Sequence, residues 1–398
     1  MPQETLRNHP LWRAEDLGQP VPNTTHAISM CLPRWRDVVG YEEQDPATMA
    51  RLRLGYPRFF YHPLVAQAFA KFAGEGECVQ IYPTRRTAER CLDYLLGQHP
   101  EARIKLRGTL IAYPAECAAD AKDYWQHAGE GISSRCAEAL LNDTPPPAAA
   151  AATAARDEIL ERLARFTGAA TADIYLFPSG MAAINAAHLA VQEIHPGRAT
   201  VQFAFPYGDT LKLQNKFGSQ PAWFYARGDC ADLAALEARL AADRVGGLFC
   251  EFPTNPLLTC VDLPALRALA NEHDFPILID ETLGACINQN TLPYSDVSAI
   301  SLTKYFSGAG DVMGGALIIN SNAPFAARFR EQLEQLHEPE AFHPADVIQL
   351  AKESANCRER VEQINRTALE VAEFLAGHPA VESVYYPALT DPHAYDRV

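Results

Sequence analysis

The chain contains 398 residues, of which 48% are hydrophobic, and its 34 basic and 49 acidic residues give a formal net charge of −15. This length provides for two or three domains with their own cores, and the apolar share excludes a wholly disordered or fibrous chain. The acidic surplus argues against nucleic acid or an anionic membrane as a partner, because both require a basic surface. An anionic ligand would have to be held by local positive charge or by helix N-termini.

Residues 1–20 lack a basic stretch followed by an apolar one, so we expect no secretory signal and a cytoplasmic location. No apolar run approaches the roughly 20 residues that span a bilayer. The ten cysteines form no Cys-x-x-Cys pair, and several, such as Cys250, lie in apolar runs. We therefore expect reduced, buried thiols and no metal site.

The first 130 residues are rich in aromatic residues and proline, and we interpret them as an N-terminal extension of mixed helix and loop. Three consecutive prolines, at 145–147, precede an alanine-rich stretch from Ala148 to Ala155. Prolines remove helix donors and alanines favour helix, so this pattern predicts a loop that leads into a helix over 155–168.

From residue 155 onward, short apolar strands alternate with amphipathic helices. This alternation predicts an α/β fold with a mainly parallel sheet between helices. After Asn320 the pattern becomes helical, and an edge strand is expected to begin at Val381. The expected strands are 173–177, 199–205, 246–252, 275–280, 297–303 and 314–320, and helices are expected at 181–194, 232–243 and 263–274. One apolar stripe is expected on a later helix, formed by Val361, Ile364, Ala368, Val371, Ala372 and Leu375.

Three strand ends carry candidate functional residues, because ligands of open parallel sheets gather at the carboxyl ends of the strands. Ser179 and Gly180 follow the first strand and open a helix, which suits anion binding, although most such pairs only cap the helix. Asp280 ends the fourth strand, where burial requires a partner, commonly a salt bridge. Lys304 follows the fifth strand and suits a Schiff-base nucleophile, although most single lysines are simply solvated.

Together these three features match the needs of pyridoxal 5'-phosphate (PLP). The lysine would bind the cofactor as an imine, the aspartate would keep the pyridinium nitrogen protonated, and the helix end would hold the phosphate. The anion would then be held by local dipoles, whatever the net charge of the chain.

The segments SGMAAI, PYGDT, EFPTNPLLTCVDLPALRALA, ILIDET and SLTKYFSGAGDVMGGALII resemble, in order and spacing, the Cys/Met-metabolism (transsulfuration) family of PLP-dependent enzymes. The front segments HAISMCLPRWRDVVGYEEQDP and GYPRFFYHP are similar to the long fungal-type cystathionine gamma-synthases. The resemblance implies the aspartate aminotransferase-like fold type I of PLP-dependent transferases. It implies an N-terminal extension (1–130), a PLP-binding large domain (131–320) and the start of a C-terminal small domain (321–398).

The same resemblance implies a role for each matching residue. Lys304 would form the imine and later move protons, and Tyr207 would stack on the cofactor ring and assist the leaving group or proton transfer. Asp280 would pair with the pyridinium nitrogen, beside Thr282, and Asn255 would lie near the phenolic oxygen and the substrate carboxylate. The phosphate would be held by Ser179, Gly180, Met181, Ser301 and Thr303.

Three departures from the family pattern stand out. Glu281 follows the strand-end aspartate where the family usually has asparagine. The family's Tyr-x-Arg element, which clamps the phosphate of a neighbouring subunit in a homodimer or homotetramer, has two candidates. We favour Arg135, which precedes a helix, over Arg58, which has the tyrosine but lies far upstream. The arginine that grips the substrate α-carboxylate is expected beyond residue 398.

The implied reaction is γ-replacement of the acyl group of an O-acyl-L-homoserine by L-cysteine, which gives cystathionine for methionine biosynthesis. The rival hypotheses are an O-acetylhomoserine sulfhydrylase or a γ-lyase of the same family, a PLP-binding scaffold without activity, and a binding module without cofactor.

Overall fold

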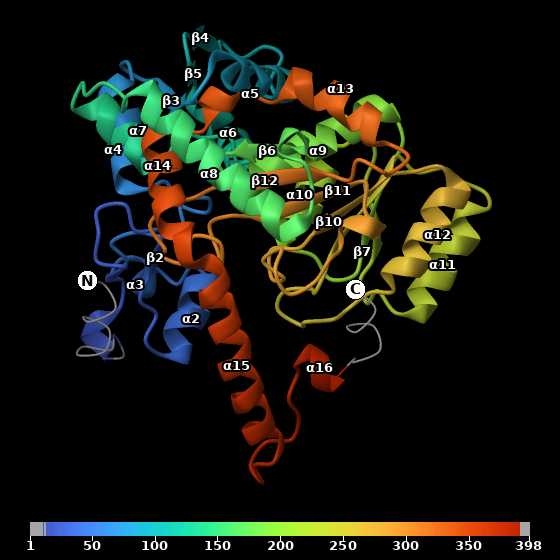
Figure 1. Cartoon of the computed structure of the whole chain (residues 1–398). Coiled ribbons are helices and arrows are strands. Elements are labelled where there is room, and N and C mark those ends of the chain that lie inside the picture. The colour runs from blue at the N-terminus through green and yellow to red at the C-terminus, as the bar shows by residue number, and fades with distance from the viewer. Residues whose placement is uncertain (1–10, 12, 391–398) are drawn as a thin grey trace.

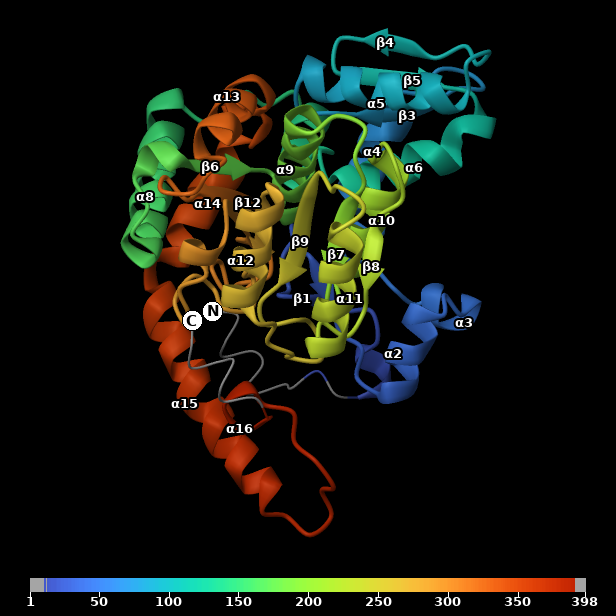
Figure 2. The same ribbon diagram turned by 90° about the vertical axis from the view of Figure 1, so that its right-hand side faces the viewer.

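The computed structural model describes residues 11 and 13–390, and its centre is a seven-stranded sheet (Figures 1 and 2). The strand order is β6-β12-β11-β10-β9-β7-β8, and all pairs are parallel except those of β12, which is antiparallel to both neighbours. The expected α/β fold with a mainly parallel sheet is therefore confirmed. The strands are Ile174–Phe177 (β6), Thr200–Phe203 (β7), Trp223–Tyr225 (β8), Gly247–Glu251 (β9), Ile277–Asp280 (β10), Val297–Ser301 (β11) and Gly315–Ile319 (β12).

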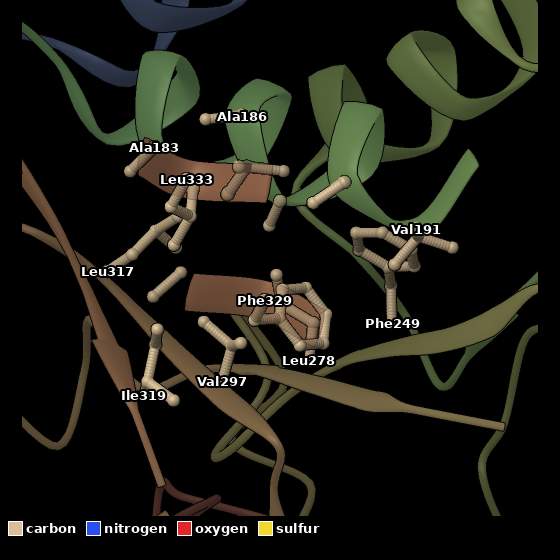
Figure 3. Close-up of a cluster of buried hydrophobic side chains, with 14 of the residues drawn as sticks. Ala183, Ala186, Val191, Phe249, Leu278, Val297, Leu317, Ile319, Phe329 and Leu333 are labelled. Atoms are coloured by element: carbon tan, nitrogen blue, oxygen red, sulfur yellow. The ribbon is translucent and has the colours of Figure 1, made fainter. Parts of the chain in front are cut away.

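Helices cover both faces of this sheet, because its strands bury apolar side chains on both sides. In β9, Leu248 and Cys250 belong to one core, whereas Phe249 between them belongs to the other. Figure 3 shows Phe249 beside Val191 in the core under α9. One face carries α9 (Gly180–Ile194), α10 (Gly208–Phe217) and α13 (Ala326–Leu336). The other carries α8 (Ala149–Thr167), α11 (Cys230–Leu240), α12 (Leu263–His273) and α14 (Pro344–Glu353).

The N-terminal part contains a second sheet, which the expectation of mixed helix and loop missed. Its three antiparallel strands lie in the order β3-β5-β4. These strands have only three or four residues, too few for a periodic pattern to identify them. The strands are Cys78–Ile81 (β3), Lys105–Arg107 (β4) and Leu110–Tyr113 (β5), and the helices packed on them are α4 (Pro63–Phe72), α5 (Arg85–Gln98), α6 (Ala118–Ala128) and α7 (Ser134–Leu141).

The segment before α4 contains short elements that lie along one side of the molecule in Figure 1. These are β1 (Pro20–Val21), β2 (Ser29–Met30), α2 (Trp35–Glu42) and α3 (Pro46–Met49).

The C-terminal part differs from its prediction in two ways. The expected strand from Val381 is wrong: in the described part of the chain, residues 381–386 pair with no strand, and α16 (Pro387–Thr390) follows. The expected apolar stripe is also divided. Val361 and Ala372 are buried, but Ile364, Val371 and Leu375 are exposed, because α15 (Cys357–Ala376) runs away from the body of the molecule (Figure 1).

The ten cysteines, all within the described residues, form no disulfide with one another, and seven of them are buried. Among the described residues, no helix is long and apolar enough to cross a membrane.

Candidate active site

A cavity of about 280 Å³ lies at the carboxyl ends of the central strands. It joins most of the residues predicted from the strand ends and loops, although they come from segments far apart in the chain. Its lining contains Tyr56, Arg58, Gly180, Met181, Ile184, Tyr207, Glu251, Pro253, Asn255, Asp280, Thr282, Leu283, Ala299, Ile300, Ser301, Lys304 and Tyr305.

Asp280, the last residue of β10, is fixed by the threonine two residues later. Its Oδ1 accepts hydrogen bonds from the Thr282 backbone N–H (3.0 Å) and from Thr282 Oγ1 (2.6 Å). Thr282 Oγ1 in turn accepts a hydrogen bond from the Ser301 N–H at 2.8 Å. Burial raises the pKa of Asp280, and the hydrogen bonds from Thr282 only partly offset it.

Glu251, the last residue of β9, is a second carboxyl group in this cavity, and it is buried. Its Oε1 accepts a hydrogen bond from the Tyr207 N–H, and its Oε2 accepts one from the Asn255 N–H at 3.0 Å. Burial, together with the nearby charge of Asp280, raises the pKa of Glu251 to about 8. Glu251 was not predicted from the sequence, although the rule that identifies Asp280, a carboxylate at the end of an apolar strand, applies equally to it.

The N-terminus of α9 forms another wall of the cavity. Ser179 caps the helix by accepting a hydrogen bond from the Ala182 N–H at 3.0 Å, and its side chain is buried away from the cavity. Gly180 and Met181, in the first turn, line the cavity. A Cβ at residue 180 would lie 2.8 Å from the Ser301 Cβ, so only glycine lets the helix approach β11 this closely.

Lys304 follows the end of β11 by three residues and faces an aromatic ring. Its Nζ is 4.2 Å from the centroid of the Tyr56 ring. Burial alone would raise the pKa of Tyr56, but the positive charges of Lys304 and Arg58 lower it overall. The Tyr56 hydroxyl therefore gives up its proton more readily than an ordinary tyrosine.

Tyr207 is held by a buried arginine. Arg58 Nη2 donates to Tyr207 Oη at 2.9 Å and to Asp209 Oδ2 at 2.7 Å. Burial raises the pKa of Tyr207, and the charge of Arg58 does not reverse the shift, so this tyrosine keeps its proton. The two tyrosines of the cavity are thus shifted in opposite directions.

Three predicted residues do not line the cavity. Ser179 caps α9, and Thr303 exchanges hydrogen bonds with the backbone of Gly314 at 3.1 and 3.2 Å. Arg135 lies in a separate polar cluster, where Nη1 is 3.1 Å from Asp346 Oδ1 and Nη2 is 3.4 Å from Asp311 Oδ2.

Within this chain, Arg58 lines the cavity and Arg135 does not, and which of the two arginines reaches the phosphate of a neighbouring subunit stays a prediction. The Arg135 guanidinium forms ion pairs with two buried carboxylates, whereas Arg58 and Tyr56 both line the cavity. The position of Arg135 before a helix, on which the preference rests, says nothing about these long-range ion pairs.

Glu281, the departure from the family pattern, points away from the cavity. Its Oε2 accepts a hydrogen bond from Thr291 Oγ1, and burial raises its pKa to about 7. This residue lies beneath β11 and does not replace any residue of the cavity lining.

The cavity chemistry fits PLP. Half-buried Asp280 and buried Glu251 are carboxyl groups for which the described residues provide no arginine or lysine ion pair, and a protonated pyridine nitrogen would supply such a cation. The first turn of α9 offers N–H groups that have no partner within the helix, which suits a phosphate. Lys304 supplies the amine.

The comparisons with known proteins agree with this chemistry. The family model for the Cys/Met metabolism PLP-dependent enzyme matches residues 151–398, and the model for the fungal trans-sulfuration enzyme N-terminal domain matches residues 62–133. A cystathionine gamma-synthase of Neurospora crassa is 31% identical, with 96% of this chain and 84% of that protein covered. An L-2-amino-4-chloropent-4-enoate dechlorinase/desaturase of Streptantibioticus cattleyicolor is 35% identical, with 93% and 77% covered.

A solved structure supports the same assignment. The cystathionine gamma-synthase of Xanthomonas oryzae pv. oryzae, in complex with aminoacrylate and cysteine, is 28% identical and superposes with a TM-score of 0.51. The match covers 61% of this chain and 62% of that chain, so it spans less than two thirds of the solved protein. The chain belongs to the Cys/Met-metabolism family of PLP-dependent enzymes, and PLP is its cofactor.

Proposed function

We propose that this chain catalyses γ-replacement: the acyl group of an O-acyl-L-homoserine leaves carbon 4, and the sulfur of L-cysteine takes its place. The products are cystathionine and a free carboxylic acid. The observation that carries the proposal is the convergence of Lys304, Asp280 and the first turn of α9 on one cavity.

Two relatives support carbon 4 as the reacting position. Cystathionine gamma-synthases are named for a product with sulfur on carbon 4, and the Streptantibioticus relative is named for a 2-amino acid that loses chlorine from carbon 4. A bond change at carbon 4 of a 2-amino acid is therefore what these names share.

When bound, PLP supplies an electron sink that stabilises negative charge at the α-carbon of the substrate. Lys304 would hold the cofactor and then act as the base that takes the α-proton and returns protons to neighbouring carbons. Asp280, oriented by Thr282, would hold the ring nitrogen in its protonated form. Gly180, Met181 and Ser301 would hold the phosphate at the start of α9.

The tyrosines suit two different proton roles. Tyr207 keeps its proton, so it would stack on the ring and donate a hydrogen bond to the departing acyl oxygen. Tyr56, whose pKa is lowered by Lys304 and Arg58, would accept a proton from the ammonium of the incoming substrate or of Lys304. Groups whose pKa values are displaced in opposite directions are suited to acid and base roles in one reaction.

The second candidate function is elimination without replacement, and the 35% identity to the dechlorinase/desaturase favours it over sulfhydrylation. In elimination, water would complete the reaction, giving 2-oxobutanoate, ammonia and the carboxylic acid. Sulfhydrylation would instead use sulfide and give homocysteine.

One assay separates these reactions. The protein, loaded with PLP, is incubated with O-acetyl- or O-succinyl-L-homoserine and with cysteine, with sulfide, or with no added nucleophile. Cystathionine in the cysteine arm supports the proposal. Equal amounts of 2-oxobutanoate in all three arms support elimination. Homocysteine in the sulfide arm, in excess of cystathionine and 2-oxobutanoate, supports sulfhydrylation. Bound PLP without any product supports an inactive scaffold.

We further propose that the chain assembles in the cytoplasm as a homodimer or homotetramer with its active sites at the subunit interface. The family resemblance supports this assembly, and the exposed apolar side chains of α15 supply surface for it, Phe374 being 68% exposed.

A further inference from the structure

The end of α6, in the N-terminal domain, touches two separate parts of the cofactor cavity. We propose that residues 126–129 are a positioning element, which holds the N-terminus of α9 and the loop at 204–207, which contains Tyr207, in the arrangement that binds PLP. This inference rests on the cofactor site and, for its effect on turnover, on the proposed function. It gives the N-terminal domain a role in the active site.

The first contact is between Gly129 and the first turn of α9. The Gly129 carbonyl accepts a hydrogen bond from the Ser179 hydroxyl at 2.8 Å, while the hydroxyl oxygen accepts one from the Ala182 N–H. The hydroxyl thus has one fixed orientation. A Cβ at residue 129 would lie 2.6 Å from Ser179 Oγ, 2.8 Å from Met181 Cβ and 2.9 Å from the Ala182 nitrogen.

Gly129 is also the residue that ends α6. Its φ of +69° is left-handed, and its N–H bonds to the Trp125 carbonyl, so it is a C-cap glycine. The close approach means that any side chain here must displace the first turn of α9, which contains Gly180 and Met181 of the cavity lining.

The second contact is between Gln126 and the arginine that holds Tyr207. The Gln126 carbonyl accepts a hydrogen bond from Arg58 Nη1 at 2.6 Å, and its side-chain Nε2 donates to Asp209 Oδ1 at 3.2 Å. A cation at a helix C-terminus interacts favourably with the free carbonyl groups there. Arg58, so placed, reaches Tyr207 Oη.

The neighbouring residues anchor this helix end. His127 Nδ1 lies 3.3 Å from Asp209 Oδ1, with both side chains buried. Glu130 pairs with Arg90 of α5 at 2.6 Å and accepts a hydrogen bond from Tyr124 Oη at 3.0 Å. The α6 end is therefore fixed to its own domain and, through Gly129 and Gln126, to both parts of the cavity.

The test compares Gly129→Ala with Gly168→Ala. Gly168 is the C-cap of α8, with φ of +75° and an N–H bond to Ala164, but no atom lies within 4 Å of a Cβ placed there. Both substitutions therefore impose the same backbone strain, and only Gly129→Ala pushes on α9.

The readout is the affinity of the apoprotein for PLP, measured by titration, together with the thermal unfolding midpoint of the apoprotein. We expect Gly129→Ala to weaken PLP binding at least ten-fold and Gly168→Ala to change it less than two-fold. Equal PLP affinity in the two variants would overturn the proposal. Because PLP binding requires no substrate, this result is independent of whether γ-replacement is the reaction.

If Gly129→Ala does not fold, the variant Gln126→Met tests the positioning role in its place. This change keeps the size of the side chain and removes only its hydrogen bond to Asp209. We expect an unchanged unfolding midpoint, an altered visible circular dichroism of bound PLP, and a several-fold lower kcat at unchanged KM. A wild-type spectrum together with wild-type kcat would contradict the positioning role.

Discussion

At the scale of single residues, the cavity is defined by two carboxyl groups, Asp280 and Glu251, that form no ion pair within the described part of the chain. Half-buried Asp280 and buried Glu251 lie side by side on neighbouring strands, and the charge of Asp280 adds to the effect of burial in raising the pKa of Glu251. A protein keeps such a pair only where a ligand or a proton balances it. We propose that the protonated ring nitrogen of PLP is the balancing group, which would link the electrostatics of the apoprotein to its cofactor.

Glu251 makes the apoprotein sensitive to pH. Its pKa rises from an ordinary 4.5 to about 8 on folding, so the folded state binds more protons than the unfolded state between these values. The stabilising effect of this proton is complete below pH 4.5 and is lost as the pH rises towards 8. We expect Glu251→Gln to remove this loss, so that the unfolding free energies of variant and wild type diverge between pH 5 and pH 8. Parallel pH profiles in urea unfolding would contradict the assignment.

The two candidate arginines give opposite predictions. Removing Arg135 leaves Asp311 and Asp346 buried without a cation, so Arg135→Met should destabilise the apoprotein by about 3–5 kcal/mol and leave PLP affinity unchanged. Arg58→Met should instead alter the visible spectrum of bound PLP and lower kcat several-fold, because Tyr207 loses its hydrogen bond.

Denaturant unfolding and PLP titration of both variants measure these effects. If Arg135→Met weakens PLP binding as strongly as Arg58→Met does, Arg135 is the residue that reaches a cofactor.

At the scale of the elements, the strand ends could be predicted from the sequence and the long-range contacts could not. Apolar strands followed by Gly180, Asp280 and Lys304 identify one edge of a parallel sheet, because each residue type follows its strand directly. Tyr56 and Arg58 come from a segment more than 100 residues before the central sheet; their Tyr-x-Arg spacing made Arg58 a candidate, but it does not indicate that they enter the cavity of their own chain. The short strands of the N-terminal sheet were missed for the related reason that three or four residues carry no measurable period.

The N-cap of α9 gives a prediction at this scale. Ser179→Ala removes both the cap to Ala182 and the bond to Gly129, and should destabilise the protein by about 0.5–2 kcal/mol and weaken PLP binding. Ser179→Thr keeps a hydroxyl that makes both bonds and is the matched control. Urea unfolding and PLP titration test the pair of variants. Equal PLP affinity in the two variants would show that the N-cap of α9 does not affect PLP binding.

At the scale of the whole molecule, the N-terminal domain lies against the helices of the central sheet (Figure 2), and the end of α6 joins the two parts through Gly129 and Gln126. The two family models match these two parts of the chain separately, and the structure adds how the parts meet. The domain boundaries at residues 130 and 320 stay predictions.

The proposed assembly is tested by sedimentation of the PLP-loaded protein. We expect a mass of two or four times 43.8 kDa at micromolar concentration. A species of 43.8 kDa under these conditions would contradict the proposal that subunits share their active sites.

The central claim is that Lys304 and the cavity around it perform PLP-dependent γ-replacement. The most direct measurement is the formation of cystathionine from an O-acyl-L-homoserine and L-cysteine by the PLP-loaded chain, beside Lys304→Ala. We predict that the wild type forms cystathionine. In Lys304→Ala we expect a rate about 10²–10⁴-fold lower, because the positioned base is lost. PLP-loaded wild type that forms no cystathionine, or a Lys304→Ala variant that forms it at the wild-type rate, would contradict the account.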